Sequence, residues 1–157
     1  DAAAKPAPRV GLTGRITYKT SSGASRPDRG ARVLVFPEKR RGGVKLPVVG
    51  FRPGDDAADF EIAVAALRAL GGNAAIVDET GNYSLTLPAA GKYTVVVLSR
   101  YQARSEDSPI VPELVAIIAE FFDGAPERLL GQVRYHMGRV AYNGSEPITW
   151  DYSFEQQ

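Results

Sequence analysis

Two short segments of this chain have no polar face, and they restrict the possible folds more than any other feature. Residues 31–36 and 93–98 are apolar on both sides when they are read with the two-residue period of a β-strand. Such strands lie in a sheet that is covered on both faces. A plain two-sheet sandwich covers only one face of each sheet, so a further layer is predicted. We expect the strands around Val33 and Val95 to be neighbours beneath that layer.

Two helices are predicted, and they supply the further layer. Residues 55–70 begin with acidic side chains, which favour a helix N-terminus, and are followed by Gly71-Gly72, a stop signal. Residues 112–122 begin with proline, which suits the first helical position. A short helical turn is expected at residues 126–130. The apolar stripes are Phe60, Val64 and Leu67, with Ile62, Ala66 and Leu70 beside them, in the first helix and Leu114, Ile117, Ile118 and Phe121 in the second.

The remaining strands are predicted from alternation and from turn residues. Residues 83–87 and 93–98 are expected to form a β-hairpin, and Asn143-Gly144 is expected to close another. Residues 147–154 alternate as one strand, with Ile148, Trp150, Tyr152 and Phe154 facing inward. The other predicted segments are strands at residues 11–19, 74–77 and 132–142, a polar loop at residues 20–30, and either an edge strand or a loop at residues 44–51.

The composition excludes several classes of function. The chain has 157 residues, 44% of them hydrophobic, which is enough for one domain with a real core. A net charge of +1 gives no reason to expect nucleic acid as a partner. The chain has no cysteine, and His136 is its one histidine, so a metal would depend on carboxylates as co-ligands. We therefore expect no metal and no cofactor.

Two segments, taken in order, carry a family resemblance. Residues 11–36 read GLTGRITYKTSSGASRPDRGARVLVF, and residues 78–100 read DETGNYSLTLPAAGKYTVVVLSR. The order Gly-x-x-Gly-Arg, polar loop, Gly-Ala-x-Val, then Asp-x-x-Gly-x-Tyr-Ser-Leu and Gly-x-Tyr-Thr-Val resembles the carboxypeptidase regulatory-like domain family. The resemblance implies a mainly β, Greek-key, transthyretin-like (prealbumin-like) β-sandwich of about seven strands, here with two helical insertions covering one sheet. It also implies an accessory, stalk or interaction domain without catalytic residues.

The expected domain organisation follows from the resemblance and from composition. Residues 1–10, rich in alanine and proline, are expected to be a linker, and residues 11–157 a single domain. Within it, residues 39–75 are predicted to be an insertion and residues 102–157 a C-terminal extension. The linker favours an extracytoplasmic location, either secreted, periplasmic or membrane-anchored. No apolar run approaches the roughly 20 residues of a membrane span, so a membrane link is expected only through a segment preceding residue 1.

Acidic side chains come close together in the sequence at two places. These are Asp55-Asp56 with Asp59, and Asp78-Glu79. Paired carboxylates can share a proton or bind calcium, so a hydrolase that uses them is one hypothesis. The favoured interpretation is a helix start at the first pair and a β-turn at the second.

Arginine and aromatic residues supply the candidate ligand-binding site. Tyr101, Arg104, Arg134 and Tyr135, with Arg139 nearby in the sequence, could line a polar groove. The clustered aromatics Trp150, Tyr152 and Phe154 are instead expected in the core, because they share the inward face of one strand.

The sequence as a whole favours a non-enzymatic interaction or scaffold module of a secreted or membrane-tethered bacterial protein. Its expected partner is a protein or a cell-surface component, with a glycan as a further possibility. The alternatives are a carbohydrate- or peptide-binding module that uses the four candidate residues, and a hydrolase that uses paired carboxylates.

Overall fold

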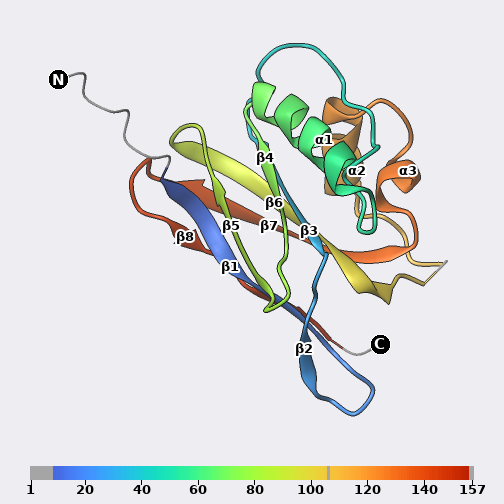
Figure 1. Cartoon of the computed structure of the whole chain (residues 1–157). Coiled ribbons are helices and arrows are strands. Elements are labelled where there is room, and N and C mark those ends of the chain that lie inside the picture. The colour runs from blue at the N-terminus through green and yellow to red at the C-terminus, as the bar shows by residue number, and fades with distance from the viewer. Residues whose placement is uncertain (1–8, 106, 156–157) are drawn as a thin grey trace.

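The computed structural model describes residues 9–105 and 107–155, which form two β-sheets packed face to face with helices on one outer side (Figure 1). In the first sheet, β1 (Val10–Lys19) pairs with β2 (Ser25–Pro27), β5 (Asn82–Thr86), β8 (Ile148–Thr149) and β9 (Tyr152–Phe154). The second sheet has the order β4 (Asn73–Ile76), β3 (Arg32–Pro37), β6 (Gly91–Ala103), β7 (Val133–Tyr142). The helices are α1 (Ala57–Ala69), α2 (Pro112–Phe121) and α3 (Pro126–Leu130). The prediction of a mainly β sandwich is confirmed.

The two strands without a polar face lie side by side in the second sheet, as predicted. Val33 pairs with Val97, and Val35 pairs with Val95. These four valines are buried in the core between the sheets. Their neighbours along β3 and β6, which are Leu34, Phe36, Val96 and Leu98, are buried in a separate core beneath the helices. Burial of each side chain is worth about 1.5–3 kcal/mol, so β3 and β6 stabilise both layers at once.

Helix α1 begins at the predicted acidic residues and covers the second sheet. The Asp56 carboxylate accepts a hydrogen bond from the Ala58 N–H (2.8 Å), which caps the helix. Phe60, Val64 and Leu67 are buried against the sheet. Ile62, however, is 71% exposed, so its place beside the buried stripe was wrongly assigned. It lies on the solvent side of the helix, while Ala63 takes the buried position next to it.

Helix α2 is held at its C-terminal end by the loop that precedes α1. Arg40 donates to the carbonyl of Glu120 (2.6 Å), and Lys45 donates to the carbonyl of Ala119 (2.8 Å). Cations stabilise a helix C-terminus because its last carbonyls are unpaired and partly negative. Residues 44–51 form no strand and contribute one bridge, between Leu46 and Phe122. This loop therefore anchors a helix.

The predicted hairpin of residues 83–98 is wrong, because its two strands lie in different sheets. Strand β5 pairs with β1 in the first sheet, and β6 pairs with β3 and β7 in the second. The burial pattern explains this separation. In β5, Tyr83 and Leu85 are buried while Asn82 and Ser84 are exposed, which suits a sheet with one wet face. The middle of β6 is buried on both faces, which suits the sheet between two cores.

The hairpin predicted at Asn143-Gly144 is also wrong. The turn forms, with the Asn143 side chain accepting from the N–H groups of Ser145 and Glu146, but it leads to β8, which pairs in parallel with β1. The strand predicted at residues 147–154 is divided into β8 and β9, both on β1. The predicted polar loop at residues 20–30 contains β2, which pairs with the end of β1 and extends from the body of the sandwich (Figure 1).

We predict that Gly14→Ala destabilises the protein strongly. A β-carbon at Gly14 would lie 1.9 Å from the carbonyl oxygen of Trp150, between β8 and β9. The backbone would have to move, and the expected loss in free energy of unfolding is about 2–4 kcal/mol, as for other forced overpacking. Urea denaturation measures this loss. The matched control is Gly43→Ala, where nothing lies within 4 Å; equal stabilities of the two variants would contradict the close approach.

Candidate functional site

Three of the four predicted ligand-binding residues line one cleft at the start of β7. The cleft, of about 460 Å³, is bounded by Arg104, Arg134 and Tyr135. We call it the β7 cleft. The rest of its lining is Ser108, Pro109, Val111, His136 and Met137. The segment before α2 forms one wall and β7 the other, so the site depends on residues that are some 30 positions apart in the chain.

Arg104 fixes the wall of the cleft that precedes α2. Its guanidinium donates to the carbonyl of Ser108 (2.9 Å) and to the carbonyl of Gly131 (2.7 Å). The Arg104 N–H also bonds the Gln132 carbonyl (2.6 Å), which joins the end of β6 to the start of β7. The Nε atom of Arg104 is buried without a hydrogen-bond partner in the described residues. The Arg104 side chain therefore holds the loop before α2. Among the described residues, its guanidinium hydrogen-bonds only to neutral carbonyl groups.

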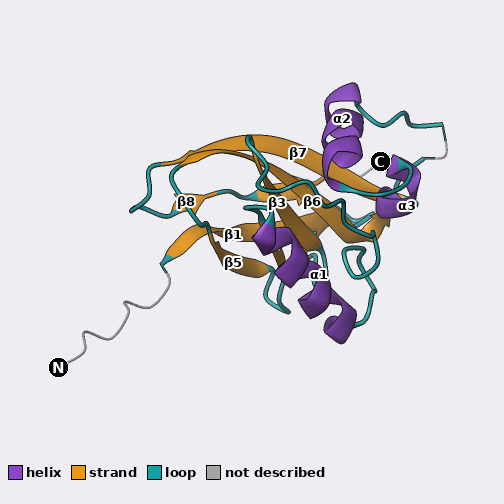
Figure 2. Ribbon diagram, turned by 90° about the horizontal axis from the view of Figure 1, so that it is seen from above, coloured by secondary structure: helices purple, strands orange, loops and turns teal. Residues whose placement is uncertain are grey.

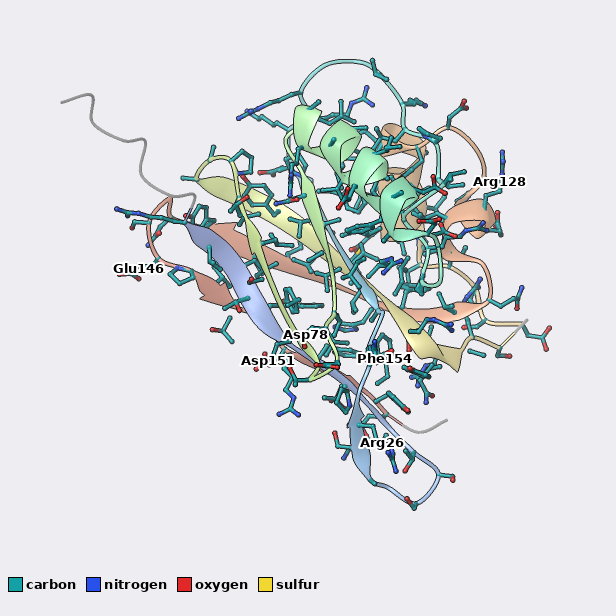
Figure 3. All side chains as sticks on the ribbon, in the orientation of Figure 1. Arg26, Asp78, Arg128, Glu146, Asp151 and Phe154 are labelled. Carbon is teal, nitrogen blue, oxygen red and sulfur yellow. The ribbon has the colours of Figure 1, made fainter. Side chains whose placement is uncertain are left out.

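Arg134 places a second positive charge on the opposite wall. Its guanidinium donates to the Glu155 carbonyl and lies 5.6 Å from the centre of the Phe154 ring. In the described part of the chain, neither Arg134 nor Arg104 has a carboxylate within ion-pair distance. Figure 3 shows Phe154 at the end of the sandwich from which the β2 segment with Arg26 extends. Two arginines that have no carboxylate partner among the described residues thus line the cleft.

Tyr135 connects the cleft to the helical layer. Its hydroxyl accepts a hydrogen bond from the Val111 N–H (2.9 Å), immediately before α2. The same ring packs against the core beneath the helices. Tyr135 therefore positions the start of α2.

His136 lies in a stack of three nearly parallel rings where the edges of the two sheets meet. Its ring centre is 3.7 Å from that of Tyr152 and 5.9 Å from that of Trp150. Trp150 also covers Gly138 on β7, where a β-carbon would lie 2.8 Å from the indole nitrogen. Trp150 and Tyr152 pack against the core between the sheets, as predicted. Burial lowers the pKa of the His136 imidazole, so the ring is neutral at pH 7.

A buried carboxylate holds the part of β6 that leads into the cleft. Where the register between β6 and β7 shifts, Asp28 accepts hydrogen bonds from the Ser99 hydroxyl (2.6 Å) and the Arg100 N–H (2.9 Å). The Ser99 hydroxyl oxygen accepts in turn from the Gln102 N–H (3.0 Å). Asp28 and Ser99 are fully buried. Burial raises the pKa of the Asp28 carboxyl, and these hydrogen bonds offset part of the rise.

Tyr101, the fourth predicted residue, lies outside the β7 cleft. It projects from the irregular part of β6 and stacks on Tyr18 of β1, with ring centres 5.2 Å apart. Its side chain is 53% exposed, and the Arg100 guanidinium lies 5.9 Å from its ring centre. Arg139 is likewise separate: it does not line the cleft and forms an exposed ion pair with Glu113 (3.6 Å). The structure therefore divides the predicted residues between two places.

In each acidic pair, a carboxylate accepts hydrogen bonds from backbone N–H groups. The Asp55 carboxylate accepts from the Gly50 and Arg52 N–H groups (2.9 and 3.2 Å). Asp78 accepts from Thr80 and Asn82 in a turn, and these bonds lower the pKa of its carboxyl. No group of three His, Asp or Glu side chains able to hold a metal occurs in the part that the structure describes. No helix in that part combines the length and apolar character that crossing a membrane requires.

A larger cleft, of about 510 Å³, lies on the helical side of the second sheet between α2 and β7. Its floor is mainly apolar and includes Phe36, Ile117 and Phe121. Its rim carries both signs of charge, from Lys92, Arg139, Glu38 and Glu120. It therefore lacks the single sign of charge that distinguishes the β7 cleft.

Comparison with known proteins adds little. No protein-family model matches the chain, and no curated protein matches it. One solved structure that it resembles is a crystal structure of a Pseudomonas aeruginosa protein, provisionally described as carbohydrate-binding. The two are 16% identical with a TM-score of 0.47, over 96% of this chain and 92% of the other. At this level the likeness does not bear on what this chain binds.

Sequence reasoning missed several residues of this region. Ser108, Val111 and Met137 reach the cleft only because the chain folds back beside β7, and no local pattern marks them. His136 stacks on the Tyr152 ring, which belongs to a strand of the other sheet. Asp28 lies in a stretch predicted as a polar loop, where a buried carboxylate has no local signal.

We predict that Asp28→Ala lowers the free energy of unfolding by about 1–3 kcal/mol, because it leaves the Ser99 hydroxyl and the Arg100 N–H without their acceptor. Asp28→Asn is expected to be milder and to reveal a pH dependence. The folded wild type binds this proton at a higher pH than the unfolded chain does, so acidification from pH 7 stabilises wild type relative to Asp28→Asn. Urea denaturation at several pH values measures the difference; an opposite slope would contradict the raised pKa.

We also predict that His136 titrates below its ordinary pKa of 6.5. It is the one histidine of the chain, so its imidazole signal in proton NMR needs no assignment. Because the unfolded chain binds the proton at a higher pH, the stability that the neutral ring contributes is lost as the pH falls through this range. Tyr152→Ala, which uncovers one face of the imidazole, is expected to move the midpoint back towards 6.5. A wild-type midpoint at or above 6.5 would rule out the effect of burial.

Proposed function

We propose that this chain is a non-enzymatic binding module and that its partner occupies the β7 cleft. The observation that carries the proposal is the pair of arginines, Arg104 and Arg134, which both line this cleft and have no carboxylate partner in the described residues. A partly buried, uncompensated charge is costly, and an incoming anion offsets that cost. The β7 cleft, which Tyr135 and His136 also line, therefore favours an acidic ligand.

The state of the acidic residues supports a binding function over hydrolysis. Acid–base catalysis by carboxylates needs two that converge on a substrate, usually with one pKa raised. Asp56 caps a helix, Asp55 holds a loop, and Asp78 closes a turn. Neither acidic pair lines the clefts described above.

The family proposal is a transthyretin-like, Greek-key sandwich of the carboxypeptidase regulatory-like type. Two features support it. The chain passes from β4 in the second sheet to β5 in the first and back to β6 in the second, as Greek-key connections do. Gly14, in the Gly-x-x-Gly-Arg motif, permits the close approach of the Trp150 carbonyl. As part of the same proposal, the module works outside the cytoplasm, in a secreted or membrane-tethered protein; the alanine- and proline-rich composition of residues 1–10 supports this.

A glycan is the second candidate ligand, and a specific observation favours it. The Tyr101 ring stacks on Tyr18 and is 53% exposed, with the Arg100 guanidinium nearby. An exposed aromatic face beside a polar donor is the usual arrangement for binding a sugar ring. This site is separate from the β7 cleft, so variants can distinguish the two.

We predict that a short polyglutamate peptide or an oligogalacturonate raises the melting temperature of the protein. At about 100 times its Kd, a ligand adds about 2.7 kcal/mol, which corresponds to about 5–10 °C for a domain of this size. Arg134→Gln is expected to weaken binding of either polyanion about tenfold, or ~1.4 kcal/mol. The matched control is Arg15→Gln on the exposed face of β1.

The two candidate sites give different results in this assay. Polyanion binding that Arg134→Gln weakens and Arg15→Gln leaves unchanged would support the β7 cleft. Binding of a neutral oligosaccharide that is lost in Tyr101→Ala and kept in Arg134→Gln would support the second candidate instead. If no polyanion shifts the melting temperature, the proposed β7 cleft function is wrong.

A further inference from the structure

The edge of the second sheet at β7 is open. In the strand order β4-β3-β6-β7, β7 is terminal and pairs only with β6 among the described strands. It is ten residues long, from Val133 to Tyr142. Figure 2 shows it along the outer margin of the molecule, with α2 near one end. An edge strand presents a row of unpaired N–H and C=O groups that can pair with another strand.

This edge is long and contains no proline, and the device against strand addition that it does carry is its charged side chains. Such edges are usually short, interrupted by proline, or covered by another element. Strand β7 contains no proline, and nine consecutive residues on it, from 133 through 141, are at least partly exposed. The opposite edge strand, β4, has four residues and lies beside β5 and α1. The β7 edge is therefore the better site for an added strand.

The charges along β7 indicate which strand would pair with it. The strand carries the positive charges of Arg134 and Arg139 and no acidic residue. Arg104 adds a further positive charge beside its first residues. Two copies of β7 side by side would bring like charges together, which opposes pairing. An acidic strand, in contrast, would place its carboxylates near the two arginines of the cleft.

The rings near this edge favour a peptide over a glycan. The ring of His136 is covered by Tyr152, and Trp150 lies over Gly138. These aromatic faces are engaged within the protein, so they are poorly available to stack on a sugar. Backbone groups and cationic side chains remain, and these recognise an extended acidic peptide.

We propose that an extended, acidic segment of a partner protein adds as a strand to the free edge of β7, with its carboxylates at Arg104 and Arg134. The inference rests on the proposed function, since it names the ligand class of the same cleft. Main-chain hydrogen bonds to β7 hold the peptide, and the two arginines select for acidic side chains.

The test uses a fluorescein-labelled peptide of about six residues, the usual length of a strand, in which glutamate and valine alternate. Its affinity for the whole chain is measured by fluorescence anisotropy. Two analogues carry N-methyl groups on alternate amides, one on each edge of the peptide. Because strand addition uses only one edge, one analogue is expected to bind about tenfold or more weakly and the other about as well as the parent. This comparison needs no change to the protein.

Matched protein variants test the charge. Arg134→Gln is expected to lower the affinity for the parent peptide about tenfold. Arg15→Gln, on the other sheet, is expected to leave this affinity unchanged. The same peptide with lysine in place of glutamate is expected to bind much more weakly. Amide hydrogen exchange followed by NMR provides an independent readout, since strand addition protects alternate amides of β7 and leaves those of β5 unaffected.

The outcomes separate the inference from the proposed function. Unequal binding of the two N-methylated analogues, with protection of alternate β7 amides, supports strand addition. Equal binding of both analogues, with the Arg134→Gln effect retained, overturns strand addition and leaves the cleft as a binding site. If oligogalacturonate binds and the acidic peptide does not, the proposed peptide ligand is wrong and the ligand class is an anionic glycan. If neither probe binds, the inference falls together with the proposed function.

Discussion

The structure depends on the burial of β3 and β6 on both faces. Val33, Val35, Val95 and Val97 fill the core between the sheets, and Leu34, Phe36, Val96 and Leu98 fill the core beneath the helices. A sheet of this kind is stable only when two layers cover it. The first sheet covers one face of β3 and β6, and the helices cover the other. The positions of the other elements therefore depend on these two strands.

The candidate site lies where this arrangement ends. Beyond Leu98 the regular pairing of β6 with β7 is interrupted, and the Asp28 carboxylate bonds the backbone of the irregular segment. The same irregularity separates Tyr101, which turns towards Tyr18, from Arg104, which turns towards the start of β7. The buried Asp28 carboxylate thus holds the backbone at the point where β6 leaves its regular pairing.

The sequence predicted the strands and helices better than their pairing. The strands at β1, β3 and β6 and both main helices follow from local periodicity and capping residues, because these depend on neighbours within a few positions. The two predicted hairpins were wrong because a turn between two strands does not specify that they pair with each other. Residues 87–90 and 143–147 instead carry the chain from one sheet to the other, where each strand meets a layer that suits its burial.

The sequence by itself determined that two strands must be covered on both faces, that two helices are available to cover one face, and that arginine and tyrosine residues occur together near positions 101–104 and 134–135. Only the tertiary structure decided that Arg104, Arg134 and Tyr135 share a cleft, that Tyr101 lies outside it, and that β7 pairs on one edge only among the described strands. The physical reason is the separation along the chain over which each kind of interaction acts. Periodicity and capping act over one or two turns of chain, whereas a cleft and a sheet edge depend on contacts between segments tens of residues apart.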